Sequence, residues 1–220
     1  MADRQTAGRG RTRNVWWSPP GCLMLSLAIG EDDLPGDIST RPLLSLVVGV
    51  ALLRAAERLT GLASLELKWP NDLYISGKKG AGILIETISD QLSPVGPVWI
   101  IGIGLNVEVP WHEAPPDVAT KGICLSLASG RAINVESALV ELIESLRSEL
   151  EGWRSGSWDW LHLWNERSLL SDKIVQLRLP TGEMLVGRCE GIDLHGRLLL
   201  RDQLQTHAVG AAEVVSWDSV

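Results

Sequence analysis

The stretch LELKWPNDLYISGKKGAGILIETI, residues 65–88, alternates short apolar runs with turn residues. Short runs rich in Leu, Ile and Tyr, bounded by Pro, Asn, Asp and Gly, are typical of β-strands. A run of the same character follows further along the chain. The predicted strands are 65–69, 73–76, 82–88 and 98–107. The predicted turns are Pro70-Asn71-Asp72, Ser76-Gly77 and Ser93-Pro94.

The segments on either side of this region carry other patterns. Apolar residues recur at helical spacing over 42–59, and Gly61 stands where such a helix would stop. Residues 134–152 are amphipathic, with Asn134 as the predicted N-cap. The remaining segments are 22–29, predicted as a buried strand, 111–121, predicted as a proline-rich loop, and 158–168, predicted as a short helix.

The composition changes near Ser171. From Lys173 onward, short β runs alternate with turns, which is typical of a small all-β unit of about fifty residues. The sequence therefore predicts an α+β domain followed by a small β-barrel.

The overall composition limits the classes of protein to which the chain can belong. Of 220 residues, 45% are hydrophobic and 21% charged, which suits a folded globular chain. The net charge of −7 argues against a nucleic-acid or anionic-membrane partner. The sequence shows neither an apolar run long enough to span a membrane nor a signal peptide, so we expect a cytoplasmic protein.

Cysteine and histidine give no sign of a metal or a covalent nucleophile. The three cysteines are far apart, and the four histidines include no HExxH pair. A GxSxG elbow and a phosphate-binding P-loop are also missing from the sequence. Zinc-dependent and serine- or cysteine-nucleophile mechanisms are therefore not expected.

Three segments combine glycine with charge. In the first, Gly8-Arg9-Gly10-Arg11, the glycines leave backbone N–H groups accessible and the arginines are suited to carboxylate or phosphate. The alternative is a flexible, solvated arginine loop. In the second, Lys68 ends a predicted buried strand, where a cation is costly unless it meets an anion. The alternative is that Lys68 extends to solvent beside an ordinary turn.

The third segment consists of glycines within predicted strands. Gly82 follows Lys78-Lys79-Gly80-Ala81, and Gly102 and Gly104 precede Asn106. A glycine inside a strand marks a place where a ligand or another backbone lies close. Each segment is weak evidence alone.

Taken together and in this order, the segments resemble the biotin–protein ligase family. The matching motifs are Gln5…Gly8-Arg9-Gly10-Arg11 with Trp16-x-Ser18-Pro19-x-Gly21, Lys68-Trp69-Pro70-Asn71-Asp72, Lys79-x-x-Gly82-Ile83-Leu84-x-Glu86, and Gly102-x-Gly104-x-Asn106. The resemblance implies a mixed-sheet catalytic domain over 1–170 and an SH3-like β domain over 171–220.

The resemblance also implies a two-step reaction. Biotin and MgATP would give biotinyl-5′-AMP and pyrophosphate, and a lysine of a biotin carboxyl carrier domain would then take the biotinyl group. Lys68 and Arg11 would act in catalysis. The residues implied to contact biotin, its adenylate or the nucleotide are Gln5, Gly8, Arg9, Gly10, Arg11, Trp16, Lys68, Asn71, Gly82, Gly104 and Asn106. The Mg²⁺ ligands are not assigned.

The chain departs from the family pattern at its start. In family members a strand, a hydroxyl-rich segment and a helix precede the Gln5 motif, so we expect part of the biotin pocket to be missing here. Thr12, Arg13 and Asn14 stand where many members carry Arg-Gly-Arg. No DNA-binding domain precedes the motif either, so a repressor role is not expected.

Several alternatives stay open at this point. The chain could be a truncated or non-catalytic biotin or adenylate binder, a lipoate–protein ligase of the same architecture, or an RNA-binding module built on the arginine loop. Two copies of the chain could also pair through the strand 98–107 to form a homodimer.

Overall fold

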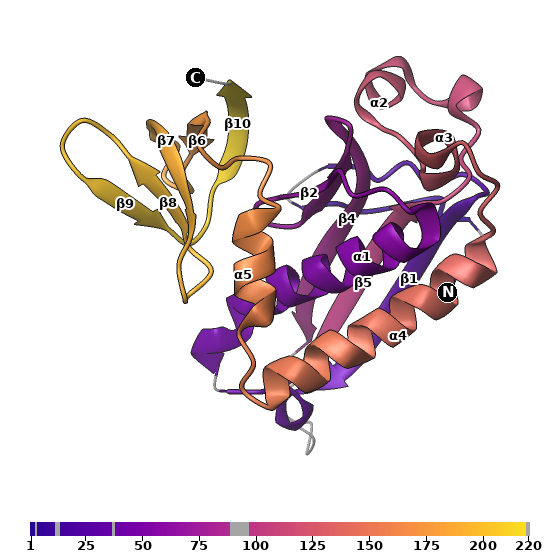
Figure 1. Cartoon of the computed structure of the whole chain (residues 1–220), viewed down its shortest axis with the longest axis horizontal. Helices are drawn as coiled ribbons and strands as arrows, with labels where there is room; N and C mark the ends of the chain where they lie inside the picture. Colours follow the sequence, from indigo (N-terminus) through magenta and orange to yellow (C-terminus); the bar gives the residue numbers. More distant parts are fainter. Residues whose placement is uncertain (3, 12–13, 37, 89–96, 219–220) are drawn as a thin grey trace.

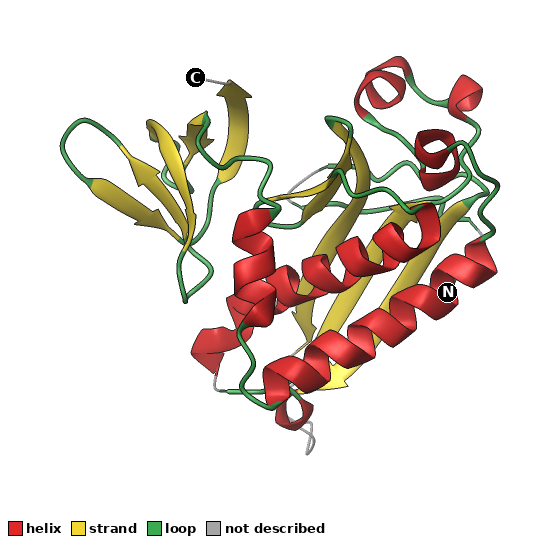
Figure 2. Cartoon of the chain, in the orientation of Figure 1, coloured by secondary structure: helices red, strands yellow, loops and turns green. Residues whose placement is uncertain are grey.

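The computed structural model describes residues 1–2, 4–11, 14–36, 38–88 and 97–218, so Thr12, Arg13 and the Ser93-Pro94 turn lie outside the described residues. Two five-stranded sheets and a layer of helices make up the chain (Figure 2). The first sheet contains β1 (Cys22–Gly30), β2 (Leu65–Lys68), β3 (Asp72–Ile75), β4 (Lys78–Ile88) and β5 (Val98–Asn106).

The first sheet has the strand order β1-β5-β4-β3-β2, and every neighbouring pair is antiparallel. The expectation of a mixed sheet is therefore wrong for these strands. The physical reason is that β2 to β4 follow one another through tight turns, which can join only antiparallel neighbours. The strands β1 and β2 form opposite edges of the sheet.

The position of β5 also corrects the expected dimer contact. β5 lies between β1 and β4, and both of its backbone edges are occupied by these two strands. The prediction that two copies pair through residues 98–107 is therefore wrong, because a strand needs a free edge to accept another strand.

Helices α1 (Leu44–Thr60) and α4 (Val135–Arg154) lie side by side across one face of this sheet (Figure 1). The predicted stop of α1 at Gly61 and the predicted N-cap of α4 at Asn134 are confirmed. Gly61 ends α1 in the left-handed conformation with φ 71°, and the Asn134 side chain accepts a hydrogen bond of 2.7 Å from the Ser137 N–H.

The segment 111–121 contains more structure than the predicted loop. Residues Trp111–Glu113 form a 3-10 turn, and α2 (Pro116–Lys121) follows, with proline in its first turn. Proline suits that position because its φ is already helical and its missing N–H has no helical partner. A further short helix, α3 (Leu125–Ser129), was not expected, whereas α5 (Asp159–Glu166) confirms the helix expected over 158–168.

The second sheet has the order β10-β6-β7-β8-β9 and is antiparallel throughout. Its strands are β6 (Ile174–Arg178), β7 (Met184–Ile192), β8 (Leu198–Arg201), β9 (Thr206–Val209) and β10 (Glu213–Asp218). The buried Trp69 indole N–H donates a 3.0 Å hydrogen bond to the Gly196 carbonyl and so links the two sheets. Among the described residues, no helix is both long and apolar enough to cross a membrane.

Candidate active site

The sheet register places the predicted site residues in one row. Lys68 is opposite Asp72, Asp72 opposite Gly82, Gly82 opposite Gly104, and Gly104 opposite Met24. The residues flanking this row along the strands, such as Leu67, Leu73 and Leu105, are buried in the core. Because neighbouring residues of a strand point to opposite faces, the row lies on the face away from α1 and α4. Three of the four motifs thus meet on one open face.

The fourth motif folds over this face. The segments 8–11 and 14–16 are paired by backbone hydrogen bonds, in which the Gly10 N–H donates to the Asn14 carbonyl at 2.8 Å and the Trp16 N–H donates to the Gly8 carbonyl at 3.0 Å, and we call these two segments the hairpin. A Cβ atom at Gly8 would lie 2.3 Å from the Trp16 carbonyl oxygen, so only glycine fits there. These bonds argue against the alternative of a flexible arginine loop. Gln5 is joined to the end of the hairpin, since its Oε1 accepts from the Ser18 hydroxyl at 3.4 Å.

The Trp16 side chain lies directly on the glycine floor. A Cβ atom at Gly104 would lie 2.6 to 2.8 Å from three atoms of the Trp16 indole, and one at Gly82 would lie 3.4 Å from the same ring. The indole nitrogen Nε1 is buried and has no hydrogen-bond partner among the described residues. The two glycines therefore make room for the Trp16 indole, and a ligand that used the same floor would have to displace it.

Four cations surround this floor, and each has a different partner. Arg9 forms a 2.8 Å ion pair with Glu86, at the surface. Lys79 forms a 2.6 Å ion pair with Asp72, and its Nζ lies 5.6 Å from the centre of the Trp16 ring system.

Arg11 lies closer to the row. It donates a 3.4 Å hydrogen bond to Asn71 Oδ1. Burial lowers the pKa of its guanidinium, and the negative charge of Asp72 opposes this shift.

Lys68 differs from Arg9 and Lys79, each of which forms an ion pair with a carboxylate. Burial lowers the pKa of its ammonium, Asp72 acts in the opposite direction, and the positive charges of Lys79 and Arg11 lower it further. Within the part of the chain that the structure describes, no carboxylate oxygen lies within 4.0 Å of Lys68 Nζ. A half-buried cation without a close counterion is suited to receive an anionic ligand.

The two predicted asparagines have structural bonds. The Asn71 amide donates to the Ile83 carbonyl at 2.7 Å and thereby fastens the turn before β3 to β4. Asn106 is 5% exposed, donates to the Ile123 carbonyl at 3.1 Å, and accepts from the Cys22 thiol at 3.5 Å. Their assignment to the nucleotide stays a prediction.

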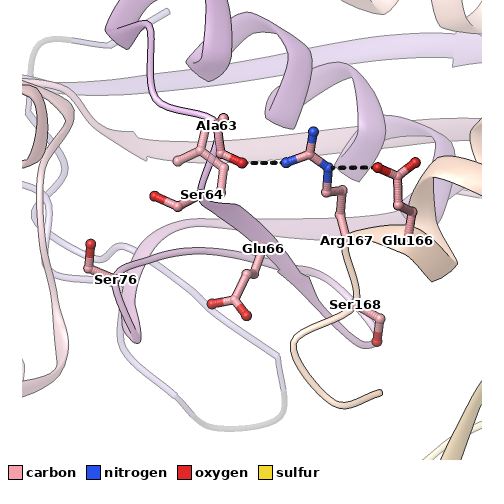
Figure 3. A pocket seen from close by; sticks show the side chains of 8 residues that line it. Ala63, Ser64, Glu66, Ser76, Glu166, Arg167 and Ser168 are labelled. Atoms are coloured by element: carbon pink, nitrogen blue, oxygen red, sulfur yellow. Dashed lines mark hydrogen bonds and ion pairs between the residues drawn. The ribbon is translucent and has the colours of Figure 1, made fainter. Parts of the chain in front are cut away.

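Two hollows lie near the sheet. One, of about 480 Å³, is formed by the hairpin and by β4, and its lining residues are Thr6, Ala7, Gly8, Arg9, Gly10, Asn14, Val15, Leu84 and Glu86. The other, of about 370 Å³, lies at the outer edge of β2 beside α5 (Figure 3). Its arginine, Arg167, bonds to the Ala63 carbonyl and pairs with Glu166 at 3.6 Å (Figure 3). Arg167 also pairs with Glu57 at 3.3 Å. Only the first hollow contains residues of the predicted site.

Several residues of the site were missed by sequence reasoning. Lys79 and Glu86 stand within a quoted motif but were given no role, and their ion pairs with Asp72 and Arg9 show that they organise the site. Trp217 and Tyr74, whose rings lie beside Lys68, had no signal in the sequence, because contacts between distant segments leave no local pattern.

The fold and this face define an α+β domain that gathers cations and glycines under a closing hairpin, as a binder of an anionic small molecule requires. Residues 1–106 match the model of the biotin/lipoate A/B protein ligase family. The chain is 33% identical to the biotin–[acetyl-CoA-carboxylase] ligase of Mycobacterium tuberculosis, over 98% of this chain and 77% of that protein. It is 31% identical to the bifunctional ligase/repressor BirA of Bacillus spizizenii, over 97% of this chain and 64% of that protein.

A solved structure agrees with these sequence matches. The biotin protein ligase of Aquifex aeolicus in complex with biotin and ATP superimposes with a TM-score of 0.83 at 26% identity, over 99% of this chain and 87% of that one. The chain therefore belongs to the biotin protein ligases of the biotin/lipoate protein ligase family, which confirms the resemblance drawn from the four motifs. It spans slightly less than two thirds of the length of the Bacillus relative.

Proposed function

We propose that this chain is an ATP-dependent biotin protein ligase, which forms biotinyl-5′-AMP and transfers the biotinyl group to a lysine of a biotin carboxyl carrier domain. The observation that carries the proposal is the row across the first sheet. It sets Lys68, without a close counterion, at one end of a glycine floor that a hairpin bearing Arg9 and Arg11 covers.

In the first step, two anions must approach each other. A carboxylate oxygen of biotin attacks the α-phosphorus of ATP, the bond from that phosphorus to the bridging oxygen breaks, and pyrophosphate leaves with the bonding electrons. We propose that Lys68 and Arg11 bind the carboxylate and the phosphoryl oxygens. Donors aimed at charge that develops in the transition state each contribute about 10²- to 10³-fold in rate.

In the second step, the neutral amine of the acceptor lysine attacks the acyl carbon of the adenylate. AMP leaves with the electrons of the acyl–oxygen bond, and the amine proton passes to solvent. Neither step needs a covalent nucleophile on the enzyme. The hairpin, held over the sheet by Arg9–Glu86 and Arg11–Asn71, keeps water from the mixed anhydride until the acceptor arrives.

The floor would bind the ring end of biotin. Once the Trp16 indole lifts, Gly82 and Gly104 expose flat backbone on which a bicyclic ring can lie. We propose that Gln5, Gly8 and Gly10 contact biotin or its adenylate. Asn71 and Asn106 are proposed for the nucleotide side.

The metal and the domain division are part of the same proposal. The described residues contain no group of three acidic, histidine or cysteine side chains that could hold a metal ion, so we propose that Mg²⁺ arrives bound to the phosphates of ATP. Mg²⁺ would neutralise the leaving pyrophosphate.

We propose that residues 1–170 form the catalytic domain and that residues 171–220 form an SH3-like domain. We also propose that the protein is located in the cytoplasm, where ATP is supplied.

The test is incubation of the full chain with biotin, MgATP and a biotin carboxyl carrier domain, followed by mass measurement of the acceptor. A gain of one biotinyl group that Lys68→Ala abolishes supports the ligase. Isotopic ATP–pyrophosphate exchange isolates the first step. Biotin binding without exchange would instead indicate a non-catalytic binder, and exchange with lipoate but not biotin would indicate a lipoate ligase.

A further inference from the structure

The ammonium of Lys68 lies against two aromatic rings. Its Nζ is 4.9 Å from the centre of the Trp217 ring system and 5.8 Å from the centre of the Tyr74 ring. The two rings meet edge to face, with centres 6.0 Å apart and planes at 85°. Tyr74 is on β3, beside Lys68, but Trp217 comes from β10 at the end of the second sheet. The C-terminal sheet therefore contributes a side chain to the site.

The rings stand in the place of a counterion. Lys79 on the same face forms a 2.6 Å ion pair with Asp72, whereas the carboxylate of Glu213, on the same strand as Trp217, pairs with Arg178 at 2.8 Å. An aromatic face attracts a cation through its quadrupole, but it carries no net charge. The rings can thus fix the ammonium without neutralising it.

The backbone of β10 explains how Trp217 reaches Lys68. The pairing of β10 with β6 shifts between Val214 and Ser216, and it resumes with Ser216 opposite Gln176 and Trp217 opposite Val175. An extra residue of this kind bends a strand and redirects the side chains that follow it. The irregularity lies directly before the segment Ser216–Asp218 that carries Trp217.

We propose that Trp217 is the positioning residue for Lys68. The C-terminal sheet holds the ammonium between the Trp217 and Tyr74 rings, pointed at the row and unpaired, until the carboxylate and phosphate of the substrates arrive. The inference rests on the proposed ligase function for its consequence in catalysis, but not for the contact itself. It makes the second sheet part of the adenylation site.

The contact is tested by NMR without any turnover. The chain has five lysines, so their Hε resonances can be resolved, and Lys68→Arg assigns that of Lys68. Protons held over aromatic faces resonate upfield, so the Lys68 resonance should lie upfield in the wild type. It should return toward the ordinary lysine position in Trp217→Leu and largely stay upfield in Trp217→Phe. If the chemical shift of the Lys68 resonance is unchanged in Trp217→Leu, the proposal is overturned.

The catalytic consequence is tested by placing tryptophans with increasing numbers of ring fluorines at position 217 alone. Fluorine weakens the quadrupole and leaves the shape nearly unchanged. The exchange rate should fall with each fluorine, by about 2- to 30-fold over the series, the range that a cation–π contact supports. The matched control is Trp158→Leu, at an exposed tryptophan that is the N-cap residue of α5, and it should leave exchange unchanged.

The two proposals fail in different ways. If the wild type catalyses exchange and the exchange rate does not change along the fluorine series, only the role of Trp217 is overturned. An absence of exchange in the wild type counts against the ligase function, and the NMR measurement still decides whether Trp217 holds Lys68.

Discussion

Replacing Gly104 by alanine adds one methyl group at the centre of the glycine floor. The new Cβ would lie 2.6 Å from the nearest atom of the Trp16 indole, whereas ordinary contacts begin at 3.4 Å, so the ring must move by about 0.8 Å. Overpacking of this size costs about 1 to 3 kcal/mol. Because the indole is carried by the hairpin, the cost falls mainly on hairpin closure rather than on the fold.

The same methyl group would also stand where we place the biotin ring. An energetic cost of about 1 to 3 kcal/mol corresponds to an affinity for biotin about 5- to 150-fold weaker. Calorimetric titration of the ligand-free chain with biotin measures this loss. The melting temperature should fall by no more than about 2–4 °C, the shift expected for 1 kcal/mol in a chain of this size.

Gly102→Ala is the matched control. It lies on the same strand and face, but its Cβ would meet only Leu84, with the carbonyl oxygen at 3.3 Å and the Cβ at 3.7 Å. It should therefore change the affinity for biotin by less than about 3-fold, well below the range that overpacking gives at Gly104.

The double variant Trp16→Ala/Gly104→Ala separates the two effects. The stability cost of the added methyl should vanish, because the indole is gone, while biotin binding should stay weak. Equal losses in Gly102→Ala and Gly104→Ala would refute the assignment of the floor to biotin.

Three further predictions follow from the site and from the link between the sheets. Because burial lowers the pKa of Lys68 below the ordinary 10.5, pyrophosphate exchange should fall as pH rises through that lowered pKa, and Lys68→Arg should remove this alkaline limb. The free energy of unfolding should rise across the same pH window, since the unfolded chain binds that proton more tightly. Arg11→Gly removes the bond to Asn71 and should let adenylate escape and label a bystander protein such as albumin; labelling confined to the carrier would contradict containment. Trp69→Phe leaves the Gly196 carbonyl without its donor and should cost about 1 to 3 kcal/mol in denaturant unfolding, while an unchanged midpoint would show that the link is not needed.

Local patterns predicted the elements well. The helices over 44–60 and 135–154 and the strands of the first sheet follow from apolar spacing, and the end of α1 at Gly61 and the cap at Asn134 follow from residue type. The Pro116 helix was missed because a proline-rich segment reads as a loop, although proline also suits the first turn of a helix.

The same patterns did not predict the order of the strands in the sheet. Residues 98–107 were correctly predicted as a strand, but their alternation does not say whether that strand lies at an edge or in the centre. This is why the proposed dimer contact was wrong. Strand order depends on pairing between segments far apart in the chain, and each strand alone is compatible with several orders.

The sequence by itself determined most of the secondary structure and, through four ordered motifs, the family and the residues that we propose for its chemistry. Only the tertiary structure decided how these residues meet: the register that aligns Lys68 with Gly82 and Gly104, the indole of Trp16 on that floor, and the ring of Trp217 over the lysine. The physical reason is that periodicity and residue type act over a few neighbouring positions, whereas register and ring contacts arise from packing that closes long loops of chain.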